Sequence, residues 1–182
     1  MAKVQFKLSL LGDGGVGKTS IKNRYLTGKF TDKYMTTLGV DFSSHSLKVD
    51  DKNVFIAIWD VAGQQVFSSI RKSYFEGSKG GLVVFDVTRL ESFENLLDGW
   101  ITPFYETVPD KPPMIIIANK VDLNDERLVT RESAEVFVNE LKMKFNVDHI
   151  SYLETSAKDG IGISEAFEKL TRFVLKHNSP FS

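Results

Sequence analysis

A glycine-rich loop near the start of the chain constrains the fold more than any other feature of the sequence. Residues 12–19 read Gly-Asp-Gly-Gly-Val-Gly-Lys-Thr, which fits the pattern G-x-x-x-x-G-K-[ST], and they follow an apolar run at residues 4–11. Such a loop joins a strand to the first turn of a helix, because backbone N–H groups and the helix N-terminus must converge on one anion. The chain is therefore expected to be an α/β protein that binds a phosphate group.

Each residue type in this loop has a part in binding a polyphosphate. Glycines let backbone N–H groups approach phosphate oxygens, since no Cβ stands in the way. The ammonium group of Lys18 brings a full positive charge to the terminal phosphates, and the hydroxyl of Thr19 can coordinate Mg²⁺. The residues that we expect to contact the phosphates are Gly14, Gly15, Val16, Gly17, Lys18, Thr19 and Ser20.

Short apolar runs recur along the chain and predict the strands of a sheet. They are nearly continuous in apolar residues, which is typical of strands in a parallel sheet covered by helices on both faces. One segment, residues 42–49, is polar instead and predicts an antiparallel edge strand joined by a hairpin to the run that follows it. The apolar runs lie at residues 4–11, 54–59, 81–87, 114–118 and, more weakly, 150–153.

Three longer stretches carry apolar residues at helical spacing, and we expect each apolar stripe to face the core. The first is predicted to begin with Thr88 and Glu91 as a capping box and to kink or end early near Gly99 and Pro103, whereas Thr130 is the predicted N-cap of the second. The stripes comprise Phe93, Leu96, Leu97, Trp100, Ile101 and Phe104; Ala134, Phe137, Val138, Leu141 and Phe145; and Ile163, Ala166, Phe167, Leu170, Phe173 and Val174.

Composition narrows the class of protein further. The 182 residues suit one domain, and 23 basic against 24 acidic residues leave no positive excess for binding nucleic acid. No apolar run reaches the roughly 20 residues that cross a bilayer. The chain has no cysteine, which excludes disulfides and lipids attached to a thiol. We expect a cytoplasmic monomer without a membrane anchor in this chain.

A second motif indicates which base the chain binds. Asn119, Lys120 and Asp122 follow the predicted strand at residues 114–118, at the edge of the sheet where α/β proteins bind ligands. A carboxylate only accepts hydrogen bonds, so Asp122 fits the N1–H and 2-amino donors of guanine, whereas adenine lacks both. The string Thr-Ser-Ala-Lys at residues 155–158 can supply a backbone N–H to the guanine O6 atom.

The residues that would carry the chemistry follow the strand at residues 54–59. Asp60 is placed to hold Mg²⁺, Gly63 leaves an N–H free for a γ-phosphate, and Gln64 can orient an attacking water. Thr37, in an aperiodic stretch at residues 27–39, can close over the metal. Segments ordered only by a γ-phosphate are a known switching device. These residues predict a nucleotide-dependent switch.

With these motifs in this order, the sequence resembles the Ras superfamily of small GTPases over nearly its whole length. Within it the chain is most similar to the Rab branch, on the strings Leu-Gly-Val-Asp-Phe at residues 38–42, Trp-Asp-Val-Ala-Gly-Gln at 59–64, Ser-Tyr-Phe-Glu-Gly at 73–77 and Val-Val-Phe-Asp-Val-Thr at 83–88. The resemblance implies a three-layer G domain with a six-stranded sheet. It further implies nucleotide contacts at Phe30, Tyr34, Thr37, Gly63, Asn119, Lys120, Asp122, Leu123, Ser156, Ala157 and Lys158, catalysis by Gln64, Lys18 and Gly63, and Mg²⁺ ligation by Thr19, Thr37 and Asp60.

Several positions depart from the pattern of the family. Val61 stands where Thr is usual, Gln65 where Glu is usual, and two serines at residues 68–69 replace a stretch that commonly contains Arg. Because Gln64 is retained, we expect GTP hydrolysis. No Arg lies just before Thr37, so we expect hydrolysis to be slow and to be stimulated by an activating protein that supplies one.

These observations together predict a G domain over residues 1–177, with a short remnant at 178–182, that binds GTP or GDP with Mg²⁺ and regulates trafficking or signalling. Effectors, an exchange factor and an activating protein are expected to bind from Thr37 to Val49 and from Trp59 to Phe75. Membrane association is expected only if a lipidated tail follows in the full-length protein. Two other functions stay open: a guanine-nucleotide-binding interaction module with little or no hydrolysis, and a P-loop kinase or metabolic phosphotransferase, which the guanine motif disfavours.

Overall fold

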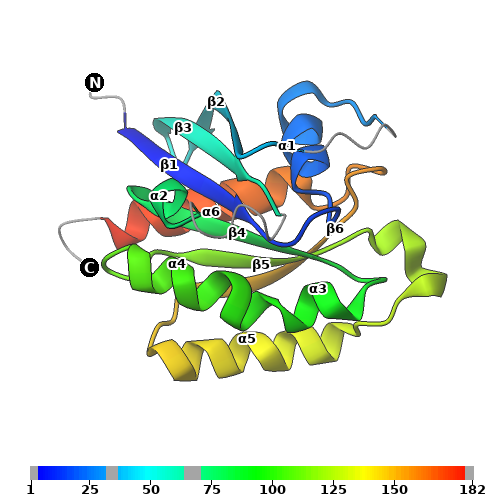
Figure 1. Ribbon diagram of the computed structural model, residues 1–182. Coiled ribbons are helices and arrows are strands. Elements are labelled where there is room, and N and C mark those ends of the chain that lie inside the picture. The colour runs from blue at the N-terminus through cyan, green and yellow to red at the C-terminus, as the bar shows by residue number, and fades with distance from the viewer. Residues whose placement is uncertain (1–3, 32–36, 64–70, 179–182) are drawn as a thin grey trace.

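The computed structural model describes residues 4–31, 37–63 and 71–178 (Figure 1). Its strands form one six-stranded sheet in the order β2-β3-β1-β4-β5-β6. Only β2 runs antiparallel to its neighbour, and it lies at an edge of the sheet, as predicted. The strands are β1 (Val4–Leu11), β2 (Val40–Val49), β3 (Lys52–Val61), β4 (Ser78–Asp86), β5 (Met114–Asn119) and β6 (Ile150–Thr155).

A two-residue turn joins the two strands of the predicted hairpin. Asp50 and Asp51 both have positive φ, 46° and 63°, and β2 pairs with β3 from Val49 opposite Lys52 onward. Two central residues with positive φ match the right-handed twist of the flanking strands, and aspartate tolerates this conformation. The hairpin confirms the predicted antiparallel edge.

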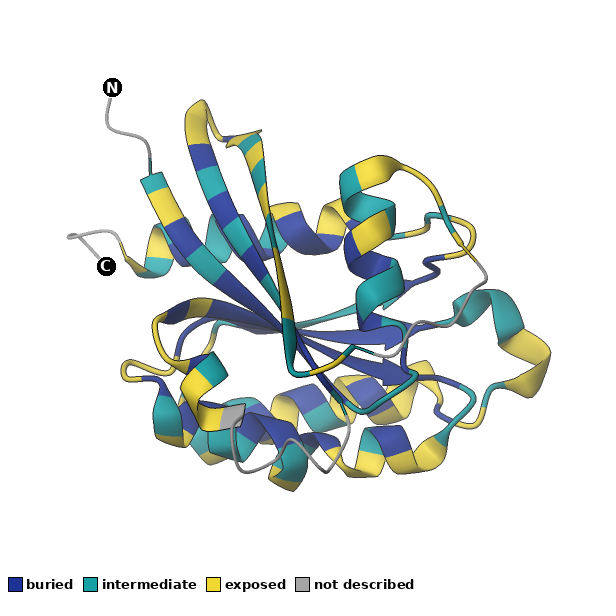
Figure 2. Cartoon of the chain, turned by 45° about the horizontal axis from the view of Figure 1, so that its top comes forward, coloured by how far each residue is buried: buried dark blue, intermediate teal, exposed yellow. Residues whose placement is uncertain are grey.

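Helices cover both faces of the sheet, which gives the predicted three layers (Figure 1). One core cluster packs α1 and α6 against the sheet, and the other packs the helices from α2 to α5 against the opposite face. Figure 2 shows the central strands as buried and the helices as buried on one side and exposed on the other. The helices are α1 (Lys18–Thr27), α2 (Arg71–Phe75), α3 (Leu90–Glu94), η2 (Leu97–Ile101), α4 (Thr102–Thr107), η3 (Val121–Glu126), α5 (Arg131–Phe145) and α6 (Ile163–His177).

The first predicted helix is broken as expected, but it begins differently. A π-helical turn, η2, separates α3 from α4 around Gly99, and α4 carries a proline in its first turn. The predicted capping box is wrong: Arg89 is the N-cap, and the Thr88 hydroxyl donates instead to the Asp86 carboxylate at 2.7 Å. The Thr88 hydroxyl thus binds the carboxylate of a residue two positions earlier and does not cap the helix. Thr130 is confirmed as the N-cap of α5, where it accepts a hydrogen bond from the Ser133 amide.

The parallel strands carry the predicted motifs to one edge of the sheet. The loops after β1, β3, β5 and β6 all leave the carboxyl ends of neighbouring or near-neighbouring strands, so they meet there. Helix α1 starts from the first of these loops (Figure 1). In the part of the chain that is described, no helix combines the length and the apolar character needed to cross a bilayer.

Candidate functional site

A cavity of about 770 Å³ opens where these loops meet. This volume falls within the range of small-molecule and cofactor sites. Its wall combines backbone from a glycine-rich loop with hydroxyls, carboxylates and lysines. The lining residues are Gly14, Gly15, Gly17, Lys18, Thr19, Ser20, Asn23, Lys29, Phe30, Thr31, Thr37, Leu38, Asp41, Gly63, Asn119, Lys120, Asp122, Leu123, Ala157 and Lys158.

The loop from β1 to α1 has the conformation that its glycines permit. Gly17, the N-cap of α1, has φ of 100°, and a Cβ at this position would overlap the side-chain amide of Asn119. Lys18 is 6% exposed, and its Nζ donates to the carbonyl oxygens of Gly12 at 2.6 Å and Asp13 at 2.9 Å. The lysine therefore ties the two ends of the loop together and places its charge beside the cavity.

Two hydroxyls and a carboxylate converge at the start of α1. Thr19 Oγ1 donates to Asp60 Oδ2 at 2.5 Å and lies 3.0 Å from Thr37 Oγ1. Asp60 is fully buried, and its Oδ1 has no hydrogen-bond partner among the described residues. Burial raises the pKa of the Asp60 carboxyl, while the Thr19 hydrogen bond and the charges of Lys18 and Lys22 oppose the rise.

This cluster fits a magnesium ion. Hydroxyl and carboxylate oxygens are the hard ligands that Mg²⁺ takes, usually with several water molecules. A buried carboxylate oxygen that lacks a partner is costly, because desolvation is not offset. A cation beside Asp60 Oδ1 would remove that cost. Thr19, Thr37 and Asp60, the predicted metal ligands, are therefore the residues of this cluster that could hold such an ion.

A lysine that the sequence analysis did not single out completes the charge balance of this cluster. Lys22, on α1, is 1% exposed and forms an ion pair with the carboxylate of Asp41 on β2. Its Nζ also lies 3.7 Å from Asp60 Oδ2. The pair joins α1 to the edge strand and links the region after residue 37 to the phosphate end of the cavity. Helical periodicity gives no signal for it, since Lys22 reads as an ordinary surface lysine.

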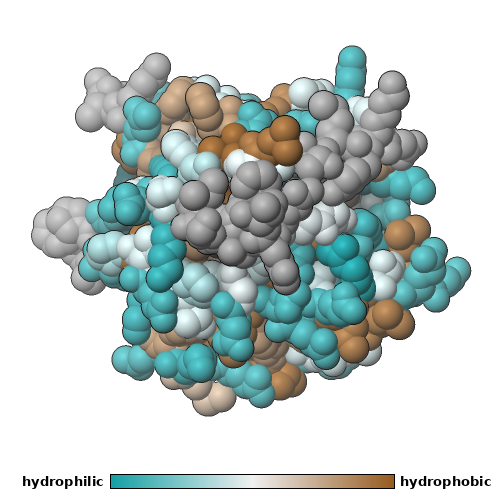
Figure 3. All heavy atoms as spheres, viewed as in Figure 1, coloured by the Kyte–Doolittle hydropathy of each residue, from teal (hydrophilic) through white to brown (hydrophobic). Residues whose placement is uncertain are grey.

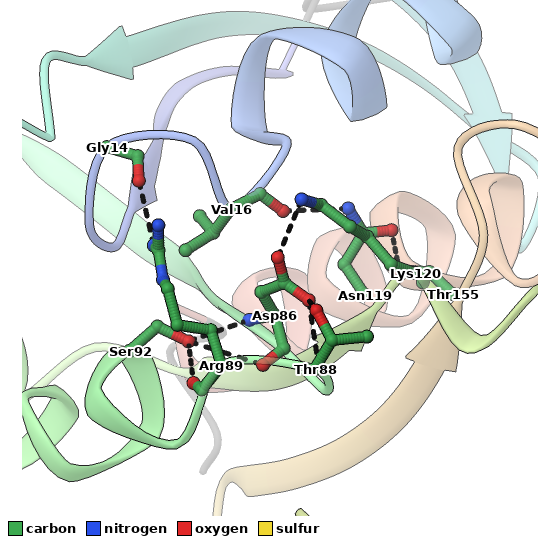
Figure 4. Close-up of polar contacts among 9 residues, drawn as sticks. All are labelled: Gly14, Val16, Asp86, Thr88, Arg89, Ser92, Asn119, Lys120 and Thr155. Atoms are coloured by element: carbon green, nitrogen blue, oxygen red, sulfur yellow. Dashed lines mark hydrogen bonds and ion pairs between the residues drawn. The ribbon is translucent and has the colours of Figure 1, made fainter. Parts of the chain in front are cut away.

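The other end of the cavity is built by the loops after β5 and β6. Asn119 Nδ2 donates to the Val16 carbonyl at 2.8 Å, and the Thr155 hydroxyl donates to Asn119 Oδ1 at 3.0 Å (Figure 4). The Ser156 hydroxyl donates to Asp122 Oδ1 at 2.6 Å. Asn119 therefore holds the phosphate loop in place, and among the described residues Asp122 presents a carboxylate that accepts a hydrogen bond from Ser156.

Lys120 is held by an acidic residue at the end of β4. Its Nζ lies 2.6 Å from Asp86 Oδ2, and its backbone is left-handed, with φ of 69° (Figure 4). Burial alone would raise the pKa of Asp86, but hydrogen bonds from Lys120 and Thr88 hold this pKa below its ordinary value. The pair fixes the direction of the Lys120 stem along the cavity wall.

Gly63, after β3, packs directly on the phosphate loop. A Cβ at this position would overlap the backbone of Asp13 and Gly14. The close approach brings the backbone of residue 63 to the same wall as the loop glycines.

Similarity to known proteins shows which family this chain belongs to. A model of the Ras family matches residues 7–176. The chain belongs to the Ras family. It is 37% identical over 178 residues to Ras-related protein Rab-7a of Dictyostelium discoideum, covering 96% of this chain and 84% of that protein.

Other relatives point the same way. The chain is 44% identical over 173 residues to Ras-related protein Rab-9B of Pongo abelii, covering 93% of this chain and 82% of that protein. It is 38% identical over 166 residues to Ras-related protein RABD2c of Arabidopsis thaliana, covering 91% and 78%. The chain is thus a Rab-like small GTPase of the Ras superfamily, and the predicted family, fold and class of enzyme are confirmed.

Most residues predicted for the site of this GTPase lie on the cavity wall. Three lie just behind it: Val16 and Asp60 are buried, and Ser156 is buried against Asp122. Tyr34 and Gln64 lie outside the described residues. The predicted residues on the wall are Gly14, Gly15, Gly17, Lys18, Thr19, Ser20, Phe30, Thr37, Gly63, Asn119, Lys120, Asp122, Leu123, Ala157 and Lys158.

Sequence reasoning missed other residues of the wall. Asn23, Lys29, Thr31, Leu38 and Asp41 line the cavity but belong to neither the phosphate-loop motif nor the guanine motif. All come from α1 or from the chain on either side of Thr37. Only their proximity in the sequence to the strictly spaced motifs could have predicted that these residues line the cavity.

Proposed function

We propose that this chain binds GTP and GDP with Mg²⁺ in the cavity described above and hydrolyses GTP slowly, as a molecular switch. The observation that carries the proposal is that one cavity joins a phosphate loop, a carboxylate fit for guanine, and the cluster of Thr19, Thr37 and Asp60. If the chain had only the phosphate loop, nucleotide binding could be proposed. Neither the preference for guanine nor a switch that responds to the γ-phosphate would then be supported.

Guanine is the base that the far end of the cavity fits. Asp122 holds one carboxylate oxygen toward Ser156, which leaves acceptor capacity for the N1–H and 2-amino donors of guanine. Adenine offers neither donor and would leave the carboxylate desolvated and unpaired, which corresponds to discrimination of roughly 10⁴ or more. The stem of Lys120 and the ring of Phe30 line the same wall and would contact the flat base.

The residues at the other end would hold the phosphates. The loop amides and Lys18 stabilise negative charge on the phosphates, and the hydroxyls of Thr19 and Thr37 with the carboxylate of Asp60 would hold Mg²⁺. When bound, Mg²⁺ neutralises charge on the β- and γ-phosphates. The backbone of Gly63 would sense the γ-phosphate through its N–H. Gln64 would orient the attacking water.

Slow hydrolysis follows from what these residues supply. Phosphoryl transfer relies on positioning and on charge stabilisation, and an arginine aimed at the γ-phosphate is worth roughly 10³–10⁵ in rate. Within the described residues, Arg89 is the arginine bonded to the phosphate loop, and it bonds the carbonyl of Gly14 rather than lining the cavity. An activating protein would supply the missing arginine.

The exposed surface beside the cavity is the proposed effector face. Leu38 and Phe42 are 77% and 72% exposed, and the rings of Phe42 and Trp59 lie 6.0 Å apart. The face seen in Figure 3 is mainly hydrophilic, with apolar side chains in small groups. Exposed aromatic and aliphatic side chains next to a nucleotide-sensing threonine suit a partner that reads the nucleotide state.

The remaining expectations follow from the family. Because the relatives are Rab-like, we place the switch in vesicle trafficking, with effectors, an exchange factor and an activating protein as partners that bind from Thr37 to Val49 and from Trp59 to Phe75. We propose that the chain acts as a monomer in the cytoplasm and that its G domain spans residues 1–177. We further propose that it does not bind nucleic acid.

The test is a single-turnover assay. The purified chain is loaded with GTP, Mg²⁺ is added, and GTP and GDP are separated by chromatography over time. We expect slow conversion to GDP in the wild-type chain and a rate at least tenfold lower in Gln64→Leu, with Gln65→Leu as the matched control that stays near the wild-type rate. Equal rates in all three chains would contradict the role of Gln64. Binding without any conversion would favour the interaction module instead.

A further inference from the structure

A cationic side chain holds the phosphate loop from outside the cavity. Arg89, the residue before α3, donates from its guanidinium to the carbonyl oxygen of Gly14 at 2.8 Å (Figure 4). Gly14 belongs to the loop after β1 and lines the cavity, whereas Arg89 does not. The two residues are 75 positions apart in the sequence, so the contact joins the β4–α3 connection to the phosphate loop.

This bond determines where the next amide of the loop points. The described residues contain no cis peptide, so the Gly14–Gly15 peptide is trans. In a trans peptide the C=O and the following N–H point in opposite directions. A Gly14 carbonyl drawn outward to Arg89 therefore directs the Gly15 N–H toward the opposite side, and both glycines lie on the cavity wall.

The two carbonyls that precede Gly14 in the loop also accept hydrogen bonds from a cation. The carbonyls of Gly12 and Asp13 accept from the Nζ of Lys18, and that of Gly14 accepts from Arg89. Three successive carbonyls thus bond to cations, which leaves the loop amides for an anion. A cation on a carbonyl also polarises the peptide and strengthens its N–H as a donor.

The segment that carries Arg89 is itself anchored to the loop. The Asp13 carboxylate accepts from Asn95 Nδ2 at 2.9 Å and from Trp100 Nε1 at 2.8 Å. The Ser92 hydroxyl donates to the Arg89 carbonyl at 2.7 Å and fixes the turn that starts α3 (Figure 4). Arg89 therefore sits on a rigid connection, which a positioning residue requires.

We propose that Arg89 is a positioning residue for nucleotide phosphates, acting through the Gly14–Gly15 peptide to aim the Gly15 N–H at a phosphate oxygen. This inference rests on the proposed nucleotide binding. It assigns a role to a residue outside the phosphate-loop and guanine motifs. Arg89 does not touch the ligand itself, so its effect is on the direction and strength of one backbone donor.

The test combines GDP affinity with the amide signal of Gly15. Arg89→Ala is expected to weaken GDP binding roughly tenfold, because a charge-assisted hydrogen bond is lost behind the loop. In the GDP-bound protein the Gly15 amide proton, followed by ¹H–¹⁵N NMR, should move upfield as its hydrogen bond weakens. Arg89→Lys should restore part of both effects. Arg131→Ala, which removes an arginine from the exposed start of α5, should change neither.

The outcomes separate this inference from the proposed function. If the wild-type chain binds no GDP, both fall. If it binds GDP and Arg89→Ala keeps the wild-type affinity and the wild-type Gly15 signal, only the role of Arg89 is overturned. If Arg89→Ala does not fold, the comparison of Arg89→Lys with Arg89→Gln decides: equal affinity and equal Gly15 signals would contradict the role of the charge.

Discussion

The hydroxyl oxygens of Thr19 and Thr37 lie 3.0 Å apart, although the two residues are separated by 18 positions and belong to different segments of the chain. Thr19 is fixed in the first turn of α1, whereas Thr37 begins the stretch that leads into β2. The two hydroxyls lie beside Asp60, whose buried Oδ1 atom has no hydrogen-bond partner within the part of the chain that the structure describes. The proposed metal site therefore lies where the irregular stretch at Thr37 meets the phosphate loop.

Replacing Thr37 by alanine tests this relationship. Loss of one oxygen ligand should lower the affinity for Mg²⁺ roughly tenfold or more with a GTP analogue bound, and less with GDP bound, since the γ-phosphate is what orders such segments. Mg²⁺ titration of nucleotide release measures both. Thr27→Ala, at the exposed end of α1, serves as the control and should behave as the wild type. An equal loss with GDP and with the analogue would speak against a switch at Thr37.

The guanine end can be tested by one isosteric change. In Asp122→Asn one carboxylate oxygen becomes an amide donor facing the donors of guanine, so GDP affinity should fall by at least a hundredfold. Competition against a fluorescent guanine nucleotide gives the affinity. Asp125→Asn is the matched control, because it makes the same change three residues further along the chain at an exposed position. Unchanged GDP affinity in Asp122→Asn would refute the base-reading role.

Gly63→Ala probes the contact between the loop after β3 and the phosphate loop. The added methyl group would overlap the backbone of Asp13 and Gly14, so one of the two loops must shift. We expect single-turnover hydrolysis to slow roughly tenfold, because misplacement of reacting groups by a fraction of an ångström is costly. Gly99→Ala is the control and should leave the rate unchanged, because the nearest side-chain atom that its Cβ would meet among the described residues is 3.9 Å away. A Gly63→Ala chain with the wild-type rate would contradict this reading.

Lys7 gives a pH-dependent prediction for stability. Its ammonium lies 3.6 Å from the centre of the Trp59 ring and donates to the Glu76 carbonyl. Burial lowers the pKa of Lys7 from 10.5 to about 8, against the opposing charge of Glu76. Between these two pH values the unfolded chain binds a proton that the folded chain does not, so this residue makes folding more favourable as pH rises from about 8 to 10.5.

Lys7→Met removes that titration. The free energy of unfolding of the wild type should therefore gain on that of Lys7→Met as pH is raised from about 7 to 10, measured by urea unfolding. Lys52→Met, at an exposed position of β3, is the control in which the difference from wild type should stay level. A Lys7→Met difference that is independent of pH would mean that the ammonium is not desolvated in the folded protein.

Much of the fold and of the site follows from the sequence, because the informative features are local. Apolar runs predict the central strands, and the polar residues at 42–49 predict the edge strand. Both predictions are possible because the number of buried faces of a strand determines its pattern of apolar and polar residues. Within each binding motif the spacing between residues is fixed, because each motif must turn at the carboxyl end of a strand. These motifs contain the loop glycines with Lys18 and Thr19, and Asn119 with Asp122.

What the sequence does not predict depends on distant partners. Lys22 has the sequence context of a surface lysine, and the carboxylates of Asp41 on the edge strand and of Asp60 compensate for its burial. Arg89 and Gly14 meet only because β4 lies beside β1. The wrong capping box has a local cause instead: Thr88 fits the pattern, but its hydroxyl donates to the carboxylate of Asp86, two residues earlier in the chain.

The most direct test of the central claim is nucleotide selectivity of the purified, nucleotide-free chain by isothermal titration with GDP and with ADP in the presence of Mg²⁺. The account predicts one tight site for GDP and ADP binding weaker by roughly 10⁴. Comparable affinity for both nucleotides, or no binding of GDP, would contradict it.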